Sequence, residues 1–255
     1  MPLVIQNLQF ICAKILAGNV FIMDNIAKRI FKTKIFDKEK LEKFGFKKSG
    51  KTYTYKQKLL DNQFELTITI STDKQIETKM TDLSSNDIYT LHLIEDADGT
   101  FVGKVRETYE TFLENLAGKC CVDTPFIFPQ SNRLSNSIKE KYNTTPEFLW
   151  EKFPGFGVFR NQKSGKWFGL ISNIDKSKLD KKHSGEIEIL NIKLDKDEIS
   201  ELVKKSGFYP AYHMNKKSWI TIILDDTIPD KNIINLIDKS YKFSESKQNI
   251  KNKKG

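Results

Sequence analysis

Eight residues in the first part of the chain match the phosphate-binding P-loop pattern letter for letter. Gly45, Gly50, Lys51 and Thr52 occupy the defining positions of G-x4-G-K-T. In a P-loop, the N–H groups at the start of a helix hold the phosphates, so a helix must follow the pattern. Here a charged, helix-forming stretch comes before the match and a strand-like stretch comes after it. We therefore interpret the match as a coincidental basic turn, and expect that ATP and GTP do not bind and that Lys51→Ala changes little.

Other residue types that carry catalysis are isolated in this sequence. The three histidines have no partner at metal-ligand spacing, and no Ser or Cys is set beside a His in a catalytic motif. They are His92, His183 and His213. The sequence therefore predicts a protein that is not an enzyme, with no catalytic residues, no cofactor and no metal site.

Basic and aromatic residues in the second half are the stronger candidates for a site. We expect Arg160, Lys163, Lys166 and Trp167 to lie at a hairpin, and Lys216 and Lys217 to lie at a turn before Trp219. Lysine and arginine bind phosphates, and an exposed tryptophan can stack on a base. Such residues would bind nucleic acid weakly, mainly through its phosphates and with little sequence specificity.

His213 and Asn215 in the same turn allow another interpretation. They could line a pocket for a small molecule or a protein partner, which is the alternative function. They could also be a buried pair that satisfies the backbone of the turn. A contiguous basic face would favour DNA, whereas a concave apolar pocket would favour the alternative.

The charge distribution supports anionic partners but has a second explanation. The net charge is +9, and it lies mainly in the second half and the last residues, because a basic stretch (28–58) is balanced by an acidic one (59–123). The chain is also rich in Lys, Asn and Ile, with only four Arg, and an AT-rich coding sequence would produce the same bias. Three cysteines without a CxxC fit a reducing compartment. We expect a cytoplasmic monomer.

Residues 1–22 differ in composition from the rest of the chain. They are apolar apart from Lys14 and a few polar residues, and they fit neither a membrane span nor a signal peptide. From Met23 the sequence becomes ordinary. We expect the native protein to begin at Met23, with an apolar helix docked on the core as the alternative.

Hydrophobic periodicity predicts an α+β fold made of two small domains, each an antiparallel sheet packed against helices. The first domain (23–122) has two short helices, a hairpin over 52–70, a third strand and an amphipathic helix over 100–117. Residues 123–130, with two prolines, are expected to be a linker. The second domain (131–243) begins and ends with a helix, with strands near 158–160, 166–172, 186–193 and 219–224. Residues 244–255 are expected to form a basic, disordered tail.

Several motifs of the second domain resemble the MmcQ/YjbR family. These are the run from Thr145 to Pro154, the Val158-Phe-Arg160 and Lys166-Trp-Phe168 segments, and the stretch Pro210-Ala-Tyr-His-Met-Asn-Lys216 before Trp219. The resemblance implies a CyaY-like fold and the DNA binding usually ascribed to the family. It does not extend to residues 1–123. Some CyaY-like proteins bind iron through an acidic first helix, but here that helix is basic, so we expect no iron site.

Overall fold

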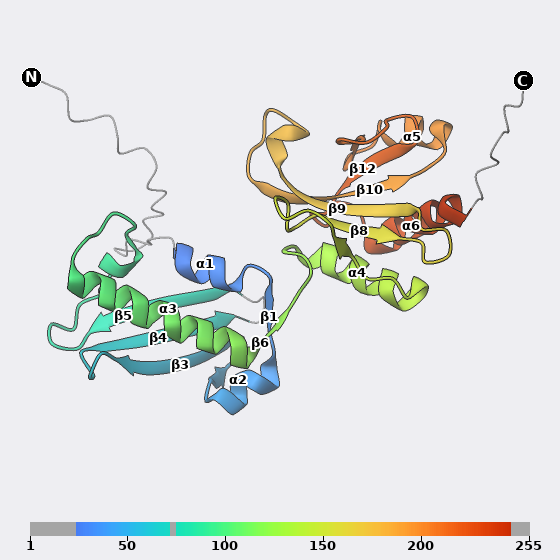
Figure 1. Ribbon diagram of the computed structural model, residues 1–255. Helices are drawn as coiled ribbons and strands as arrows, with labels where there is room; N and C mark the ends of the chain where they lie inside the picture. The colour runs from blue at the N-terminus through green and yellow to red at the C-terminus, as the bar shows by residue number, and fades with distance from the viewer. Residues whose placement is uncertain (1–23, 72–74, 246–255) are drawn as a thin grey trace, which may run out of the picture. The chain divides into compact units, whose positions relative to one another are not determined.

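A computed structural model describes residues 24–71 and 75–245, which form two compact units divided between Asp123 and Thr124. Figure 1 shows a sheet and its helices in each unit. The α+β class predicted from periodicity is confirmed. The segment 1–22, with its expected start at Met23, lies outside the described residues.

The first unit is built on a four-stranded antiparallel sheet in the order β2-β3-β4-β5. The bounds are β2 Lys47–Ser49, β3 Thr52–Leu59, β4 Phe64–Ser71 and β5 Ile76–Asp82. Alternation in β4 buries Phe64, Leu66, Ile68 and Ile70 on one face and leaves polar residues on the other. The hairpin predicted over residues 52–70 is therefore confirmed.

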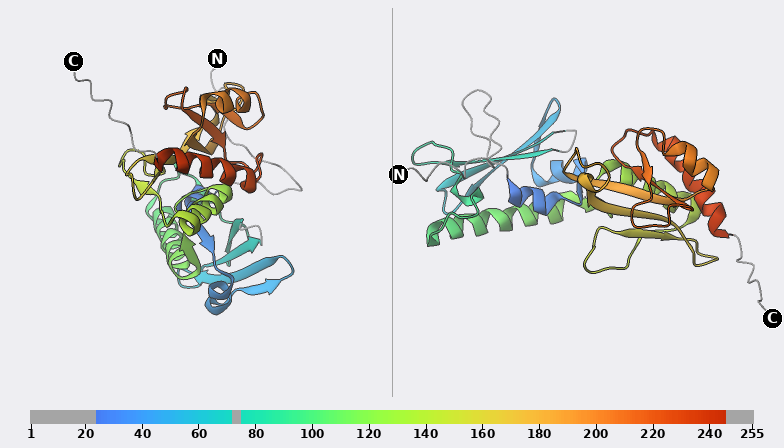
Figure 2. Two further views of the ribbon diagram at one scale, coloured as in Figure 1. Left: turned by 90° about the vertical axis from the view of Figure 1, so that its right-hand side faces the viewer. Right: turned by 90° about the horizontal axis from the view of Figure 1, so that it is seen from above.

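Three helices cover the apolar face of this sheet. They are α1 (Asn25–Phe31), α2 (Lys38–Phe44) and α3 (Thr100–Cys120), and a short helix η1 (Leu91–Leu93) precedes α3. Both views in Figure 2 show α3 running alongside the sheet. Its buried positions follow helical spacing and include Val105, Tyr109 and Leu113. A two-stranded ladder, β1 (Lys34–Phe36) with β6 (Cys121–Asp123), closes the unit.

A buried histidine lies inside the first unit. His92 is 2% exposed, its ring stands edge-on to Tyr109 at 4.7 Å, and its Nδ1 has no partner among the described residues. Tyr109 donates a hydrogen bond to Asp24, which also caps α1. Burial lowers the pKa of His92 to about 4, although the Asp24 carboxylate opposes the shift and Arg106 adds to it.

We expect the first unit to lose stability in mild acid because of His92. The unfolded chain takes up a proton below pH 6.5, whereas the folded chain resists protonation down to about pH 4, so stability falls as the pH drops through that window. The expected loss between pH 7 and pH 5 is about 2 kcal/mol. Hydrogen exchange of amides in the first unit, followed against pH, measures it. His92→Phe should remove the slope, and His183→Gln, at an exposed histidine, should keep it; an unchanged slope in His92→Phe would contradict the assignment.

The second unit contains a six-stranded antiparallel sheet in the order β11-β12-β10-β9-β8-β7. The bounds are β7 Glu147–Phe148, β8 Gly157–Arg160, β9 Trp167–Asp175, β10 Glu186–Lys193, β11 Phe208–Pro210 and β12 Trp219–Ile223. A short helix η2 (Lys176–Lys178) lies between β9 and β10. The strands expected near 158–160, 166–172, 186–193 and 219–224 are therefore all present.

Helices cover one face of this second sheet. They are α4 (Pro129–Tyr142), α5 (Lys196–Leu202) and α6 (Asp230–Glu245), with α4 and α6 on the same side in Figure 1. The core between them combines Phe159, Phe168 and Ile192 from the sheet with Leu134 and Ile237 from the helices. The opposite face carries a smaller apolar cluster around Ile189 and Ile223. The expected assembly of an antiparallel sheet and helices is confirmed.

The two units divide inside the segment expected to be a linker (123–130), and from Thr124 on this segment is an ordered part of the second unit. Phe126 is 1% exposed and belongs to the core, and Pro129 is the first residue of α4, where proline is favoured. The Glu188 carboxylate accepts hydrogen bonds from the N–H groups of Ile127 (2.9 Å) and Phe128 (3.1 Å). The segment therefore contains the boundary between the two units, but residues 124–130 pack with the second unit, and a fragment beginning at residue 131 would lose part of the core.

The expected tail also begins later than the sequence indicated. Helix α6 continues to Glu245, and Ser244 is buried, where its hydroxyl accepts a 2.9 Å hydrogen bond from Asn161. Residues 246–255 lie outside the described part of the chain. Among the described helices, none combines the length and the apolar character needed to cross a membrane.

Candidate nucleic-acid interface

Four of the predicted contact residues lie at the turn between β8 and β9. Asn161 organises this turn: its Oδ1 accepts hydrogen bonds from the N–H groups of Lys163 (2.9 Å) and Ser164 (3.1 Å). Gly165 adopts a positive φ of 69°, which glycine tolerates at no steric cost. The Lys163 side chain is exposed and that of Lys166 is half-buried. The turn therefore presents two lysines on a fixed backbone.

The other two predicted contacts lie in the turn that leads into β12. Asn215 Oδ1 accepts a hydrogen bond from the Lys217 N–H (3.0 Å), and the Asn215 carbonyl accepts from Trp219 N–H (2.9 Å). Lys216 and Lys217 are both exposed. The amide of Asn215 thus fixes the turn from which the two lysines extend into solvent.

Strand register brings these two turns to the same end of the sheet. Arg160, at the end of β8, pairs with Trp167 at the start of β9. Gly169 pairs with Ile192, and Lys193, the last residue of β10, pairs with Trp219 at the start of β12. The turns are fifty residues apart in sequence, yet only β10 and β9 separate β12 from β8.

Lys193 lies between the two turns and was not among the predicted site residues. Its ammonium nitrogen is 5.1 Å from the centroid of the Trp219 ring. Burial lowers the pKa of Lys193, and the nearby charge of Lys166 lowers it further. The sequence placed Lys193 in a strand, and only the register shows that the strand ends between the two turns. We name the set Lys163, Lys166, Lys193, Lys216 and Lys217 the basic sheet end.

Arg160 and Trp167 contact other residues of the second unit. The Arg160 Nε lies 3.2 Å from Glu147 Oε2, and Nη1 donates a 2.8 Å hydrogen bond to the Gly165 carbonyl. The guanidinium carbon lies 5.9 Å from the centroid of the Trp167 ring, which also meets Trp150 edge-on at 5.8 Å. Trp167 is therefore half-buried, and Arg160 has fewer N–H groups to offer a ligand than a free arginine.

The structure places His213 and Asn215 on the surface. Both side chains are exposed, and His213 has a φ of 53° with its ring 4.1 Å from that of Tyr212. Neither residue is buried, so the prediction of a buried pair is wrong. Asn215 still accepts a backbone hydrogen bond of the turn, but it does so from an exposed position. Binding of a ligand by these two residues stays a prediction.

The P-loop-like segment folds as a helix end followed by a hairpin. Gly45 ends α2 in the left-handed region (φ 115°), β2 and β3 pair across the turn at Gly50, and Thr52 donates a hydrogen bond to the Ser49 carbonyl (3.0 Å). The segment forms two strands instead of the single basic turn that we expected. No helix follows the match, so the helix N-terminus that a P-loop requires is missing from this segment.

Metal and thiol chemistry receive no support from the described residues. In residues 24–71 and 75–245, no three His, Cys, Asp or Glu side chains come close enough to hold a metal ion. Cys120 and Cys121 are free and buried, and burial raises the pKa of their thiols to about 11 and about 12. Both are therefore protonated at neutral pH, the less reactive form of a thiol.

Comparison with known families gives a match that lies within the second unit. The family model YjbR matches residues 139–243. The Bacillus subtilis protein YyaQ is 41% identical over 104 residues, which cover 41% of this chain and 88% of YyaQ. The Escherichia coli protein YjbR is 41% identical over 46 residues, 17% of this chain and 39% of its own length.

Solved structures align with a similar share of the chain. A crystal structure of a Pseudomonas syringae protein is 35% identical and covers 44% of this chain and 96% of its own, with a TM-score of 0.43. A Deinococcus radiodurans protein is 23% identical and covers 49% of this chain and 84% of its own, with a TM-score of 0.37. The family match and the extent of the likeness to YyaQ show, as the residues from Thr145 to Trp219 indicated, that the chain belongs to the YjbR family through its second unit.

Proposed function

We propose that the second unit binds duplex DNA through the phosphates, using the basic sheet end. The observation that carries the proposal is the convergence of two basic turns and the end of β10 at one end of the sheet. Five lysines from three separate segments would then face one ligand. Lysine is a compact charge with little ability to distinguish bases, so contacts to phosphates should dominate over base readout.

The charge environment of Lys193 also supports an anionic ligand. Burial lowers the pKa of Lys193, and repulsion from the nearby charge of Lys166 lowers it further. A phosphate near both ammonium groups would relieve that repulsion. Arg160 is a weaker contributor because Glu147 and the Gly165 carbonyl already hold its guanidinium.

A pocket around His213 and Asn215 remains the alternative, with a small molecule or a protein as the ligand. The geometry of the turn favours this alternative less than DNA binding, because the Asn215 amide oxygen already accepts a hydrogen bond from the Lys217 N–H. Its exposed His213 would be the residue to test. Saturable binding that is insensitive to salt and lost in His213→Ala would favour this alternative over DNA.

The primary test is a salt titration of the full chain with random duplex DNA. If about four phosphates are neutralised, log affinity should fall against log salt with a slope near −3.6. Between 50 and 200 mM salt this is about a 150-fold loss of affinity. Random duplexes of different composition should bind within about threefold of one another, since phosphate contacts carry no sequence information. No binding at 50 mM salt, or binding that does not weaken with salt, would contradict the proposal.

A further inference from the structure

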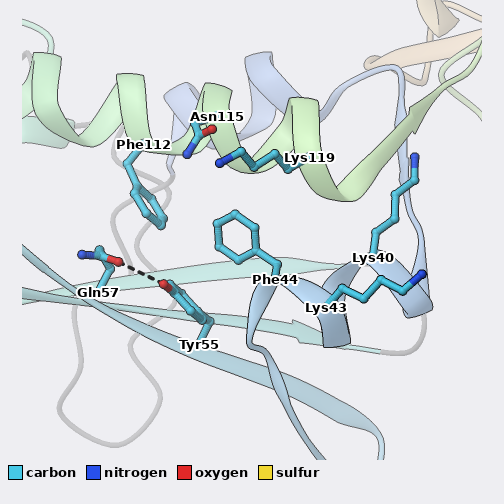
Figure 3. Close-up of a pocket in the computed structure, with 8 residues that line it drawn as sticks. All are labelled: Lys40, Lys43, Phe44, Tyr55, Gln57, Phe112, Asn115 and Lys119. Carbon is cyan, nitrogen blue, oxygen red and sulfur yellow. Dashed lines mark hydrogen bonds between the residues drawn. The ribbon is translucent and has the colours of Figure 1, made fainter.

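The first unit contains an open pocket of about 630 Å³ between α2, β3 and α3. Figure 3 shows its eight lining residues. Each element contributes side chains from one face, since positions three or four apart share a helix face and alternate positions share a strand face. The lining residues are Lys40, Lys43 and Phe44 of α2, Tyr55 and Gln57 of β3, and Phe112, Asn115 and Lys119 of α3.

Aromatic rings form the inner wall of this pocket. The rings of Tyr55 and Phe112 lie within 11° of parallel, with centroids 6.2 Å apart, and Phe44 stands edge-on to both. All three side chains are half-buried, so part of each ring is open to solvent. Gly45 packs close to the Tyr55 ring, since a Cβ at this position would lie only 3.3 Å from the ring. The inner wall therefore presents partly exposed aromatic rings that pack against one another.

The rim of the pocket is positively charged, and none of the eight lining residues is acidic. Within residues 24–71 and 75–245, the ammonium groups of Lys40, Lys43 and Lys119 form no ion pair. In Figure 3 the ammonium of Lys119 lies beside Asn115, on the side of α3 that faces the Phe44 ring, whereas those of Lys40 and Lys43 extend outward from α2. Lys119 also lies over the Phe44 ring at 5.9 Å. An anion in the pocket would therefore meet one lysine beside the rings and two at the edge.

Amide groups complete the polar lining. Gln57 accepts a hydrogen bond from the Tyr55 hydroxyl (3.0 Å) and donates one to the Lys58 carbonyl (2.9 Å), so its position is fixed. Asn115 is exposed, one turn before Lys119 on α3. Its amide can both donate and accept, which suits the polar edge of a base.

We propose that this pocket binds single-stranded nucleic acid, with a base against the Tyr55 and Phe112 rings and flanking phosphates near Lys119, Lys43 and Lys40. Sequence-tolerant binding of single strands combines aromatic surfaces for stacking with a positive groove for the backbone. The open shape allows a strand to enter and leave, whereas a closed cavity would suit a small free ligand. The site is separate from the basic sheet end and needs no contribution from it.

The probe is a fluorescent dT12 oligonucleotide, titrated against the full chain at low salt. We expect Phe112→Leu, which keeps the apolar volume but loses the flat ring, to weaken binding about tenfold. Lys43→Gln with Lys119→Gln should weaken binding and make the log affinity versus log salt slope shallower by about 1.4, since each phosphate contact on a single strand contributes about 0.7. Thermal melting of each variant checks that the first unit remains folded.

Matched controls separate the pocket from general charge. Lys58 directly follows the pocket-facing Gln57 on β3 but lies on the other, open face of the sheet, and Lys51 lies in the β2–β3 turn. Lys58→Gln and Lys51→Ala should bind dT12 as the wild type does. Equal loss in Lys58→Gln, or full dT12 binding by the pocket variants, would overturn the proposal. Displacement of dT12 by a mononucleotide at the same concentration of nucleotide units would also overturn the proposal, because it would indicate a site for free nucleotides.

The pocket variants should keep the salt slope of duplex binding. Failure of the single-strand proposal is therefore distinguishable from failure of the function proposed for the second unit.

Discussion

Glu188→Ala is expected to destabilise the second unit by about 2–5 kcal/mol. Glu188 is 1% exposed, and its two carboxylate oxygens accept the N–H groups of Ile127 and Phe128 at 2.9 and 3.1 Å. Phe128 is the N-cap of α4 and has no side chain able to cap the helix; Glu188, sixty residues away, instead accepts the N–H groups of this residue and of the one before it. Alanine would leave two part-buried donors without acceptors; each costs about 1–3 kcal/mol when fully buried and less where water can reach it.

Urea unfolding followed by tryptophan fluorescence measures this loss in the full chain, because all three tryptophans lie in the second unit. Glu188→Gln is the matched control: it keeps one acceptor and nearly the same volume, so we expect it to lose much less stability than the alanine variant. An alanine variant as stable as the wild type would show that the two hydrogen bonds accepted by Glu188 contribute nothing to the free energy of unfolding.

The same residue gives the second unit a pH dependence opposite to that of His92. Burial raises the pKa of Glu188 above 4.5, although the two N–H donors oppose the shift. The folded state therefore holds this proton more tightly than the unfolded state does, so the contribution of Glu188 to stability grows as the pH falls toward 4.5. Glu188→Gln should abolish this contribution.

The elements were predictable because their signals are local. Period-two alternation identified the β3–β4 hairpin, and helical spacing identified α3, since both depend only on neighbouring residues. The packing of residues 124–130 with the second unit was not predicted, for the converse reason. Its order comes from Glu188 and from Phe126 in the core, which are tertiary interactions that two prolines and a polar composition do not reveal.

The candidate sites show the same division between local and long-range signals. The two basic turns were visible as Lys-rich segments beside turn residues, but their convergence depends on strand register, and so does the place of Lys193 between them. The pocket of the first unit was missed altogether, because α2, β3 and α3 each supply only two or three of its residues. In the sequence those residues are indistinguishable from an ordinary amphipathic pattern.

Replacing Lys216 and Lys217 together with alanine should remove two phosphate contacts from the second unit. Each lost contact flattens the slope of log affinity against log salt by about 0.9, so the duplex slope should change from near −3.6 to near −1.8. Over 50 to 200 mM salt, the variant would lose only about 12-fold in affinity where the wild type loses about 150-fold. Both lysines are exposed beside a turn held by Asn215, so the fold should not change.

Lys181 and Lys182 provide the matched control for this prediction. They form a second exposed lysine pair in the same unit, and they follow the end of β9, where Asp175 pairs with Glu186 at the opposite end of the sheet. Their double alanine variant has the same net charge as Lys216→Ala with Lys217→Ala but keeps the basic sheet end intact. We therefore expect it to retain a slope near −3.6. If both double variants flatten the slope equally, the affinity for DNA depends on net charge alone and the basic sheet end is not the binding site. If only Lys216→Ala with Lys217→Ala flattens the slope, the contacts lie where the two basic turns meet.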